Sequence, residues 1–460
     1  MKKIFIILFS LSIVAEIKNN YLDSSEINEP DETIVINKYN ASIFNDGRFE
    51  GFGTSFCWWP NRLGYSDDLS EKSATLFFDK EKGLGLTVIR YNIGGGDDPS
   101  HDHITRTDSA MPGYAINPKY NNESQTYTWD YDWTKDFNQR NVLFKCVEKN
   151  KEEITFQSIA PMNEPNLSKW EAYSQKQEGC HFKQGESQSK ILIELKKALI
   201  EKGLEDIKIS ASDETNINHQ IKSYNLLSDE AKKVISRIDT HTYQGNQRLQ
   251  LRELAENEGK NLWMSEADSW AAIGKNAGEM GAALSFASGI IRDLNGFRCS
   301  TWIIWQVIDN HICKNGYNGK KDSGMVNLES GYWGVAVADH DKSEIILTQK
   351  YYAFGQFSRY IRPGYTIISG SEYSVAALDR DGKKLVIVAM SIEKKDKSIY
   401  FDLSTFSTIG SNIKVIRTSG SVSDGEKWAE LEPIPTNGKG FSASLKSNSI
   451  TTYIIDGVEE

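Results

Sequence analysis

The sequence predicts a parallel α/β barrel followed by an antiparallel β-sandwich. Short apolar runs alternate with amphipathic segments across residues 49–350, and this alternation is typical of strand–helix units. Over residues 351–460, short alternating runs separated by turn residues replace that pattern, as in β-sandwiches. The chain has 460 residues, which is enough for a barrel of roughly 250–350 residues and a smaller second domain.

Seven runs in the first part have the length and composition of barrel strands. Most are rich in β-branched or aromatic residues. The predicted strands are residues 51–55, 86–91, 154–162, 207–212, 237–243, 261–266 and 301–306. Apolar residues at helical spacing predict the intervening helices. These helices are residues 69–82, 132–150, 184–202, 249–258 and 271–294.

The C-terminal part begins with a predicted helix over residues 351–360. Four strands are predicted after it, at residues 374–378, 384–389, 413–416 and 449–455. An earlier strand near Ile34 is expected to join the same sandwich, so residues 33–48 would connect the two parts. Residues 17–32 are polar and acidic, which predicts a flexible tail.

Two of the predicted strands end at a glutamate. Residues 154–162 lead to Glu164, and Pro165 then prevents further ladder pairing because it has no N–H. Residues 261–266 end at Glu266. The carboxyl ends of barrel strands carry the chemistry, and glycoside hydrolysis needs two carboxylates, one to protonate the leaving oxygen and one to attack. The alternative is that both glutamates lie in solvated loops.

Composition narrows the class of ligand. The net charge of −10 and pI near 5.4 argue against nucleic acid and anionic lipid as partners, since both require basic surfaces. The eleven Trp and twenty Tyr residues are consistent with a carbohydrate ligand, because aromatic faces stack on the apolar faces of sugars. Packing of aromatic residues into a core explains them nearly as well.

The N-terminus predicts export. Lys2 and Lys3 precede an apolar run over residues 4–15, which is too short to span a membrane. Residues 1–16 are therefore predicted to form a signal peptide, and the protein is expected to be secreted as a monomer without stable membrane insertion. The alternatives are a buried core strand and an interfacial anchor.

We expect neither a metal nor another cofactor. The glycines at 94–96 lack the Lys-Ser/Thr ending of a phosphate loop. His101 and His103 resemble a metal pair, but no further ligands follow in register, so solvated loop residues are expected. The five cysteines have spacings of neither a disulfide framework nor a zinc site. A metal-dependent barrel hydrolase would need several histidines at strand ends, and only His241 is so placed.

Five motifs occur in order along the chain. They are GFGTS with the following tryptophan pair at residues 51–59, IRYNIGG at 89–95, NEP at 163–165, DTHTY at 239–243 and WMSEA at 263–267. Together they resemble glycoside hydrolase family 30. The closest likeness is to its endo-β-1,6-galactanase branch, and the glucosylceramidases are more distant. The resemblance covers roughly residues 33–458.

This resemblance implies a TIM (β/α)8-type barrel with a fused β-sandwich and a retaining mechanism. Glu164 would be the general acid/base, which needs a raised pKa, and Glu266 the nucleophile, which must stay ionised beside donors. A retaining pair has carboxyl groups about 5–5.5 Å apart. The implied substrate-binding residues are Trp58, Arg90, Asn92, Asn163, His241, Tyr243 and Trp305.

The chain departs from the family pattern at one point. Family members place a third strand and a third helix before the Asn-Glu-Pro strand, whereas only residues 151–153 are available here. The barrel is therefore predicted to lack its third strand–helix unit, or to close differently. The leading hypothesis is a secreted retaining hydrolase of β-linked galactan. The alternatives are a non-catalytic carbohydrate-binding protein and a retaining β-glycosidase of glucosylceramidase-like or β-xylanase-like specificity.

Overall fold

The structure is a computed structural model that describes most of the chain after residue 28. The described residues are 29–460 except 96–110, 152, 169, 171, 172, 174–176, 178, 270–273, 315, 318–324 and 326. The predicted signal peptide and the pair His101 and His103 lie outside the described residues. Within the described part of the chain, no helix is long and apolar enough to cross a membrane.

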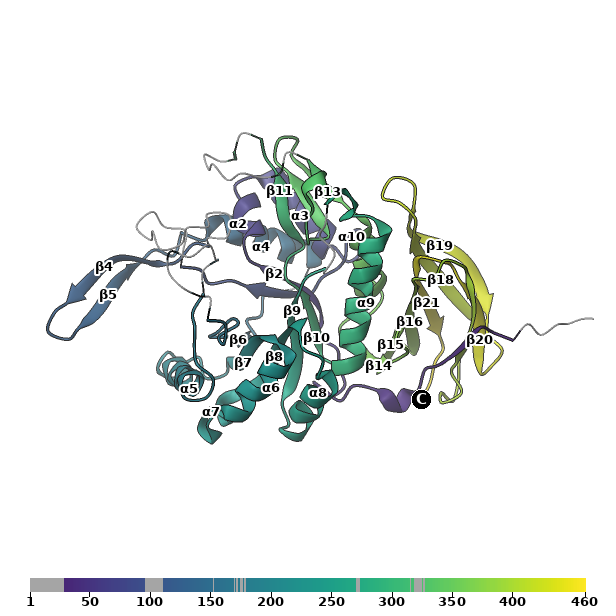
Figure 1. The fold of residues 1–460 in the computed structure, drawn as a ribbon, viewed down its shortest axis with the longest axis horizontal. Coiled ribbons are helices and arrows are strands. Elements are labelled where there is room, and N and C mark those ends of the chain that lie inside the picture. The colour runs from purple at the N-terminus through teal and green to yellow at the C-terminus, as the bar shows by residue number, and fades with distance from the viewer. Residues whose placement is uncertain are drawn as a thin grey trace, which may run out of the picture.

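A parallel sheet of seven strands forms the centre of the first part (Figure 1). Its strands are β2 (Gly51–Phe56), β3 (Val88–Tyr91), β6 (Ser158–Ile159), β7 (Lys208–Asn216), β8 (Ile235–Gln244), β9 (Asn261–Ala267) and β10 (Thr301–Ile304). The strand order is β3-β2-β10-β9-β8-β7-β6. The last strand, β10, pairs in parallel with both β2 and β9, as in a closing barrel. The predicted α/β barrel with a fused sandwich is confirmed.

Among the described residues, no strand closes the barrel between β3 and β6. These two strands stand at opposite ends of the seven-stranded order, and each pairs on one side with a named strand of this sheet. A third strand of an eight-stranded barrel would lie between them. The two edges therefore remain apart because the third strand–helix unit is missing, as the sequence predicts.

One strand is much shorter than the sequence predicts. Of residues 154–162, only Ser158 and Ile159 join the sheet. The side chains of Ile154 and Phe156 are 39% and 69% exposed. The apolar content of this run suits a buried strand, but β6 has a neighbour only on the β7 side, and a strand without a second neighbour has no apolar surface on which to bury alternate side chains.

Helices cover the outside of the sheet. They are α2 (Trp59–Leu63), α3 (Asp67–Phe78), α4 (Phe137–Asn150), α5 (Glu186–Glu201), α6 (Ile217–Leu226), α7 (Asp229–Val234), α8 (Arg248–Asn257), α9 (Met280–Phe297) and the short η3 (Gly274–Asn276). Ser66 caps α3 by accepting a hydrogen bond from the amide of Leu69, and Ser228 caps α7 in the same way. The sequence analysis did not assign α6 and α7 because their apolar positions are few.

Two sheets form the C-terminal sandwich, and the strands that follow the barrel pair antiparallel within them. The larger sheet contains β14 (Thr366–Ser369), β15 (Ser374–Asp379), β16 (Lys384–Ser391), β21 (Ser449–Asp456), β18 (Asn412–Ser419) and β19 (Glu426–Pro435) in that order. The smaller contains β1 (Glu32–Val35), β17 (Lys397–Asp402) and β20 (Gly440–Leu445). The early strand β1 pairs in parallel with β17, so the chain enters the sandwich before it builds the barrel.

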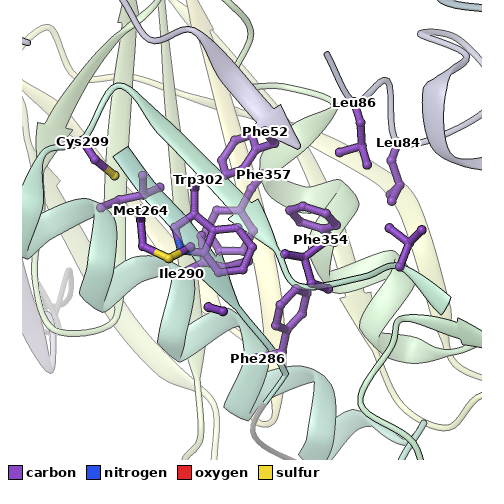
Figure 2. Close-up of a cluster of buried hydrophobic side chains, with 14 of the residues drawn as sticks. Phe52, Leu84, Leu86, Met264, Phe286, Ile290, Cys299, Trp302, Phe354 and Phe357 are labelled. Atoms are coloured by element: carbon purple, nitrogen blue, oxygen red, sulfur yellow. The ribbon is translucent and has the colours of Figure 1, made fainter. Parts of the chain in front are cut away.

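The barrel and the sandwich share one core. Figure 2 shows Phe52 of β2 and Trp302 of β10 packed with Phe286 of α9 and with Phe354 of α10 (Gln349–Ser358). The rings of Trp302 and Phe354 lie 5.8 Å apart between centroids. The same buried cluster continues to Val386 of the sandwich. Helices α9 and α10 therefore fix the two parts against each other.

The remaining elements are two small sheets beside the barrel and two short 3-10 helices. An antiparallel hairpin of β4 (Ala115–Asn121) and β5 (Thr126–Tyr131) projects from the fold (Figure 1, left). A small sheet of β11 (Ile308–Ile312), β12 (Ala336–Asp339) and β13 (Glu344–Leu347) follows β10. The 3-10 helices η1 (Lys38–Asn40) and η4 (Leu328–Ser330) complete the described elements. The sequence analysis assigned neither the hairpin nor the small sheet.

Candidate active site

Polar side chains meet at the carboxyl ends of the parallel strands. Arg90 is the next-to-last residue of β3, His241 and Tyr243 lie near the end of β8, and Glu266 is the next-to-last residue of β9. Glu164 follows β6 across a short loop, and its amide donates to the carbonyl of Asp213 on β7 at 2.8 Å. Parallel strands bring their carboxyl ends to one side of a barrel, so residues far apart in the sequence converge there.

The two predicted glutamates lie close together. Glu164 Oε1 is 3.1 Å from His241 Nδ1, and Glu266 Oε1 is 3.4 Å from the same nitrogen. One ligand atom from each of these three residues lies within 4.8 Å of the others. Both carboxylates are buried. Glu164 has a φ of 47°, in the left-handed region, and such backbone strain is typical of functional sites.

Arg90 joins four groups of the site. Its Nη1 donates to Glu266 Oε2 and to Ser55 Oγ, and its Nη2 donates to Asn163 Oδ1 at 2.6 Å and to Asp213 Oδ2 at 2.7 Å. A planar guanidinium fixes several acceptors in one geometry, which a lysine does not. Arg90 therefore orients both Asn163 and Glu266.

Asp213 is a site residue that the sequence analysis missed. It is fully buried, and Ser265 Oγ donates to its Oδ1 at 2.5 Å. His241 Nε2 lies 3.2 Å from the same oxygen. Burial opposes its charge, but Arg90 and His241 hold the pKa of Asp213 well below its usual value. The acidic pair at the end of the predicted strand 207–212 was the available signal.

His241 lies behind the two glutamates. It is fully buried and is not among the residues that line the cavity described below, so its expected contact with substrate stays a prediction. Although burial disfavours the charged ring, Glu266 and Asp213 raise the pKa of His241 to about 10. A cationic imidazolium therefore sits among three carboxylates at neutral pH.

The pKa directions of the two glutamates are the reverse of those expected. Burial acts to raise the pKa of Glu164, but the hydrogen bond and charge of His241 lower it below its ordinary value. Burial raises the pKa of Glu266, although His241 and Arg90 act against this effect. Tyr243 also donates to Glu266 Oε1 at 3.0 Å. The prediction of a raised pKa for Glu164 in the resting site was wrong because the sequence could not place His241 against it.

A cavity of 1380 Å³ opens in front of the glutamates. All the other predicted site residues line it, namely Trp58, Arg90, Asn92, Asn163, Glu164, Tyr243, Glu266 and Trp305. The rings of Trp58 and Trp305 meet edge to face, with centroids 5.1 Å apart. Among the described residues, no donor lies within hydrogen-bond reach of the buried Asn92 Oδ1.

The same cavity continues into the opening of the barrel. Leu143 and Cys146 of α4 line it, as do Leu199 of α5 and Ile207 just before β7. In a closed barrel a third strand would fill this space with layered side chains. The end of the barrel that carries the two glutamates is therefore built, whereas the wall below it is incomplete.

The cluster of Glu164, His241 and Glu266 has the residue types and spacing to hold a metal ion. A histidine must be neutral to act as a ligand. Here the raised pKa of His241 keeps the ring cationic, and Arg90 adds a second positive charge beside Glu266. The residues present therefore fit an acid–base site better than a metal site.

A match to a family model identifies the family. The model of glycosyl hydrolase family 59 matches residues 103–339. The chain belongs to glycosyl hydrolase family 59. An endo-beta-1,6-galactanase from Hypocrea rufa is 27% identical over 90% of this chain and 93% of its own length. An exo-beta-1,6-galactobiohydrolase from Bifidobacterium longum is 25% identical over 52% of this chain and 17% of its own length.

Solved structures place this family 59 chain among family 30 folds. The catalytic domain of a family 30 xylanase from Talaromyces cellulolyticus has a TM-score of 0.61 at 16% identity, covering 92% of this chain and 100% of that one. A conserved exported protein from Bacteroides fragilis has a TM-score of 0.66 at 17% identity, with the same coverage. The predicted resemblance to family 30 and its galactanase branch is confirmed, and family membership supports glycosidase activity.

Proposed function

We propose that the protein is a secreted retaining glycoside hydrolase that cleaves β-1,6-linked galactan, with Glu266 as nucleophile and Glu164 as general acid/base. The observation that carries the proposal is the convergence of these two buried carboxylates on His241, with one oxygen of each within 4.8 Å. This spacing fits a retaining pair, because an inverting pair stands about 6.5–9.5 Å apart to admit a water.

The environment of Glu266 suits a nucleophile. Arg90 and Tyr243 donate to its two oxygens, which stabilises the carboxylate and aims it into the cavity. Its attack on the anomeric carbon forms a glycosyl ester as the glycosidic C–O bond breaks, and Glu164 passes a proton to the leaving oxygen. A water that Glu164 deprotonates then displaces the ester and restores Glu266.

His241 acts as the proton donor that recharges Glu164. The imidazolium Nδ1 faces Glu164 Oε1 at 3.1 Å, so the proton can move between the two groups. In the resting site the histidine holds it. Substrate that expels water from the cavity disfavours an ionised Glu164 through desolvation, which shifts the proton toward the carboxylate. The lowered pKa of Glu164 in the resting site is thus compatible with an acid role.

The proposed substrate rests on the relatives and on the cavity lining. Both curated relatives are named for β-1,6-linked galactan or galactobiose units. Arg90 donates a hydrogen bond to Asn163 Oδ1, which turns the amide nitrogen of Asn163 into the donor for a sugar hydroxyl. Trp58 and Trp305 offer aromatic faces at the cavity wall. Export is supported by the predicted signal peptide and by the exported Bacteroides fragilis neighbour.

A second candidate is a carbohydrate-binding protein without turnover. The open edge between β3 and β6 favours it, because a retaining mechanism requires carboxylates held within about half an ångström and β6 contributes only two sheet residues before Glu164. The ion pairs of Arg90 and His241 favour the enzyme, since they fix the glutamates independently of the missing strand.

Hydrolysis of soluble β-1,6-galactan by the purified protein, beside β-1,6-glucan and β-xylan, tests the proposal. We expect galactooligosaccharides, with the β-anomer formed first by NMR, and a loss of about 10⁴-fold or more in kcat for Glu266→Gln. Glu164→Gln should lose polymer hydrolysis far more than hydrolysis of an aryl galactoside, whose leaving group needs no proton. Glu230→Gln, on α7 before the amino end of β8, is the matched control.

A folded protein that binds galactan without releasing sugar would support the second candidate. An α-anomer as first product would contradict the retaining mechanism. Release of xylooligosaccharides or glucooligosaccharides in place of galactooligosaccharides would contradict the substrate while leaving the two catalytic roles in place.

A further inference from the structure

The β4–β5 hairpin carries a row of exposed aromatic side chains. It projects away from the barrel (Figure 1, left). Tyr127, Trp129 and Tyr131 alternate along β5 and so share one face. Tyr120 of β4 is paired with Tyr127 in the ladder, and their ring centroids lie 4.9 Å apart. Trp133 follows β5 and extends the row.

The rings of this row stack on one another. Tyr127 and Trp129 lie 5.8 Å apart and are nearly parallel. Tyr131 and Trp133 lie 5.5 Å apart with an interplanar angle of 7°. Despite these contacts, the side chains remain from 43% exposed at Trp129 to 63% exposed at Trp133. An exposed series of flat rings is a surface for binding, because it leaves apolar area in water that a core would bury.

The opposite face of the hairpin is polar. Lys119 and Asp130 form a salt bridge at 3.3 Å, and Asn117 Nδ2 donates to Asp130 at the same distance. Thr128 also lies on this face, paired with Lys119. The hairpin is thus amphipathic, although its apolar face does not belong to a buried cluster. Substitutions on the polar face can therefore serve as controls for substitutions on the aromatic face.

A series of contacts runs from the cavity wall to the aromatic row. Tyr91 lines the cavity directly after Arg90, and its hydroxyl donates to Asp136 Oδ2 at 2.7 Å. Tyr114 donates to the same oxygen at 2.7 Å. The rings of Tyr114 and Trp133 then lie 5.1 Å apart. A continuous series of contacts therefore links the wall of the cavity to the hairpin.

We propose that the aromatic face of the hairpin, formed by Tyr120, Tyr127, Trp129, Tyr131 and Trp133, binds the polysaccharide chain where it leaves the active-site cavity. The proposal rests on the proposed function, because its ligand is a β-linked glycan. Side chains two residues apart on a strand stand about 6.6 Å apart, so a series of rings meets the C–H faces of successive sugar units. Continuity with the cavity favours the substrate chain over an unrelated partner.

Binding to soluble β-1,6-galactan by affinity electrophoresis tests this platform, with β-1,6-glucan and β-xylan alongside. The Glu266→Gln protein is used so that the polymer stays intact. We expect the added double change Trp129→Ala and Tyr131→Ala to weaken retention about tenfold. Lys119→Ala with Thr128→Ala on the polar face is the control and should keep the affinity. Trp129→Phe with Tyr131→Phe should also keep it, since both rings remain.

Hydrolysis by the active protein gives a second readout. The Trp129→Ala and Tyr131→Ala protein should show a ratio of polymer to aryl-glycoside activity reduced at least about fivefold, mainly through KM on the polymer. Far-UV circular dichroism and a thermal melt establish whether the double variant is folded. If its spectrum is altered, the single variant Tyr127→Ala takes its place in both assays.

The outcomes separate the platform from the proposed function. Unchanged polymer binding in the alanine variant overturns the platform, even if galactan is hydrolysed. Reduced binding without any hydrolysis by the parent protein supports the platform and contradicts the enzyme. A parent protein that binds none of the three polymers overturns the platform as well. A dimer that dissociates in the alanine variant would instead assign this face to a second copy of the chain.

Discussion

At the residue scale, one cationic histidine holds the site together. His241 contacts Glu164, Asp213 and Glu266 from a fully buried position. Three carboxylates in one buried cluster would repel one another and carry a large desolvation cost. Arg90 and the imidazolium balance that charge, so the two glutamates can remain close together.

The raised pKa of His241 predicts a loss of stability at alkaline pH. Its folded pKa of about 10 exceeds the ordinary 6.5, so this group stabilises the fold fully below pH 6.5 and loses that contribution as the pH rises toward 10. Urea unfolding between pH 6.5 and 9.5 should show that the free energy of unfolding falls as the pH rises. The fall in the parent protein should be steeper than in His241→Gln, by up to about 1.4 kcal/mol per pH unit. Parallel profiles for the two proteins would contradict the cationic assignment.

Removal of Arg90 should destabilise the protein and abolish activity. Arg90→Ala leaves Asp213 and Glu266 without their guanidinium partner, and an uncompensated buried charge costs about 3–5 kcal/mol. Arg90→Lys should restore part of the stability but little activity, because an ammonium cannot bridge the same acceptors. Lys197→Ala, at an exposed pair with Glu194, is the control. Equal stability of Arg90→Ala and the parent in guanidinium unfolding would refute this prediction.

At the element scale, the opening between β3 and β6 explains why a strand-like sequence forms only a short strand. The run at residues 154–162 has strand-like composition, yet it lies at a sheet edge with two residues paired. Sheet edges expose unpaired N–H and C=O groups and invite association with other chains. The missing unit therefore creates a specific weak point on an otherwise well-packed barrel.

A change at Phe156 tests whether that edge is open in solution. The side chain is 69% exposed, so Phe156→Ser should alter the free energy of unfolding by less than about 0.5 kcal/mol and should reduce aggregation at high concentration. Met162→Ser, at a buried position on the same segment, should cost about 2–5 kcal/mol. A large loss of stability in Phe156→Ser would mean that another segment covers this edge.

At the scale of the whole molecule, the sandwich supports the open barrel. One buried cluster runs from Phe52 of the barrel through Phe354 to Val386 of the sandwich (Figure 2). The opening lies at the other side of the sheet from β10, beside which α9 and α10 pack. The barrel is thus incomplete on one side and stabilised on the other side by the core that it shares with the sandwich.

This shared core predicts a single unfolding transition. Far-UV and near-UV circular dichroism should report the same midpoint in guanidinium, because barrel and sandwich lose one core together. Phe354→Ala should lower the free energy of unfolding by about 3–5 kcal/mol and should shift both signals equally. Two separated transitions would show that the barrel and sandwich unfold independently.

Much of the candidate site could be predicted because its residues follow strands. Glu164, Glu266 and Arg90 end apolar runs, and the parallel arrangement brings such ends together. Asp213 was missed, and the contacts of His241 with three carboxylates were not foreseen, because the pattern of one strand does not reveal which neighbour a side chain meets. The pKa directions depend on those neighbours, so they could not be predicted either.

The sequence by itself determined the succession of strands and helices, the fused sandwich and the position of two glutamates at strand ends, and its likeness to family 30 revealed the absence of a third strand–helix unit. Each of these is local, since it depends on periodicity, on turn residues or on a segment that is too short. Only the tertiary structure decided that the barrel stays open, that a buried imidazolium sits between the glutamates, and that aromatic rings line one face of a hairpin beside the cavity. These features arise from contacts between distant segments, which no local pattern encodes.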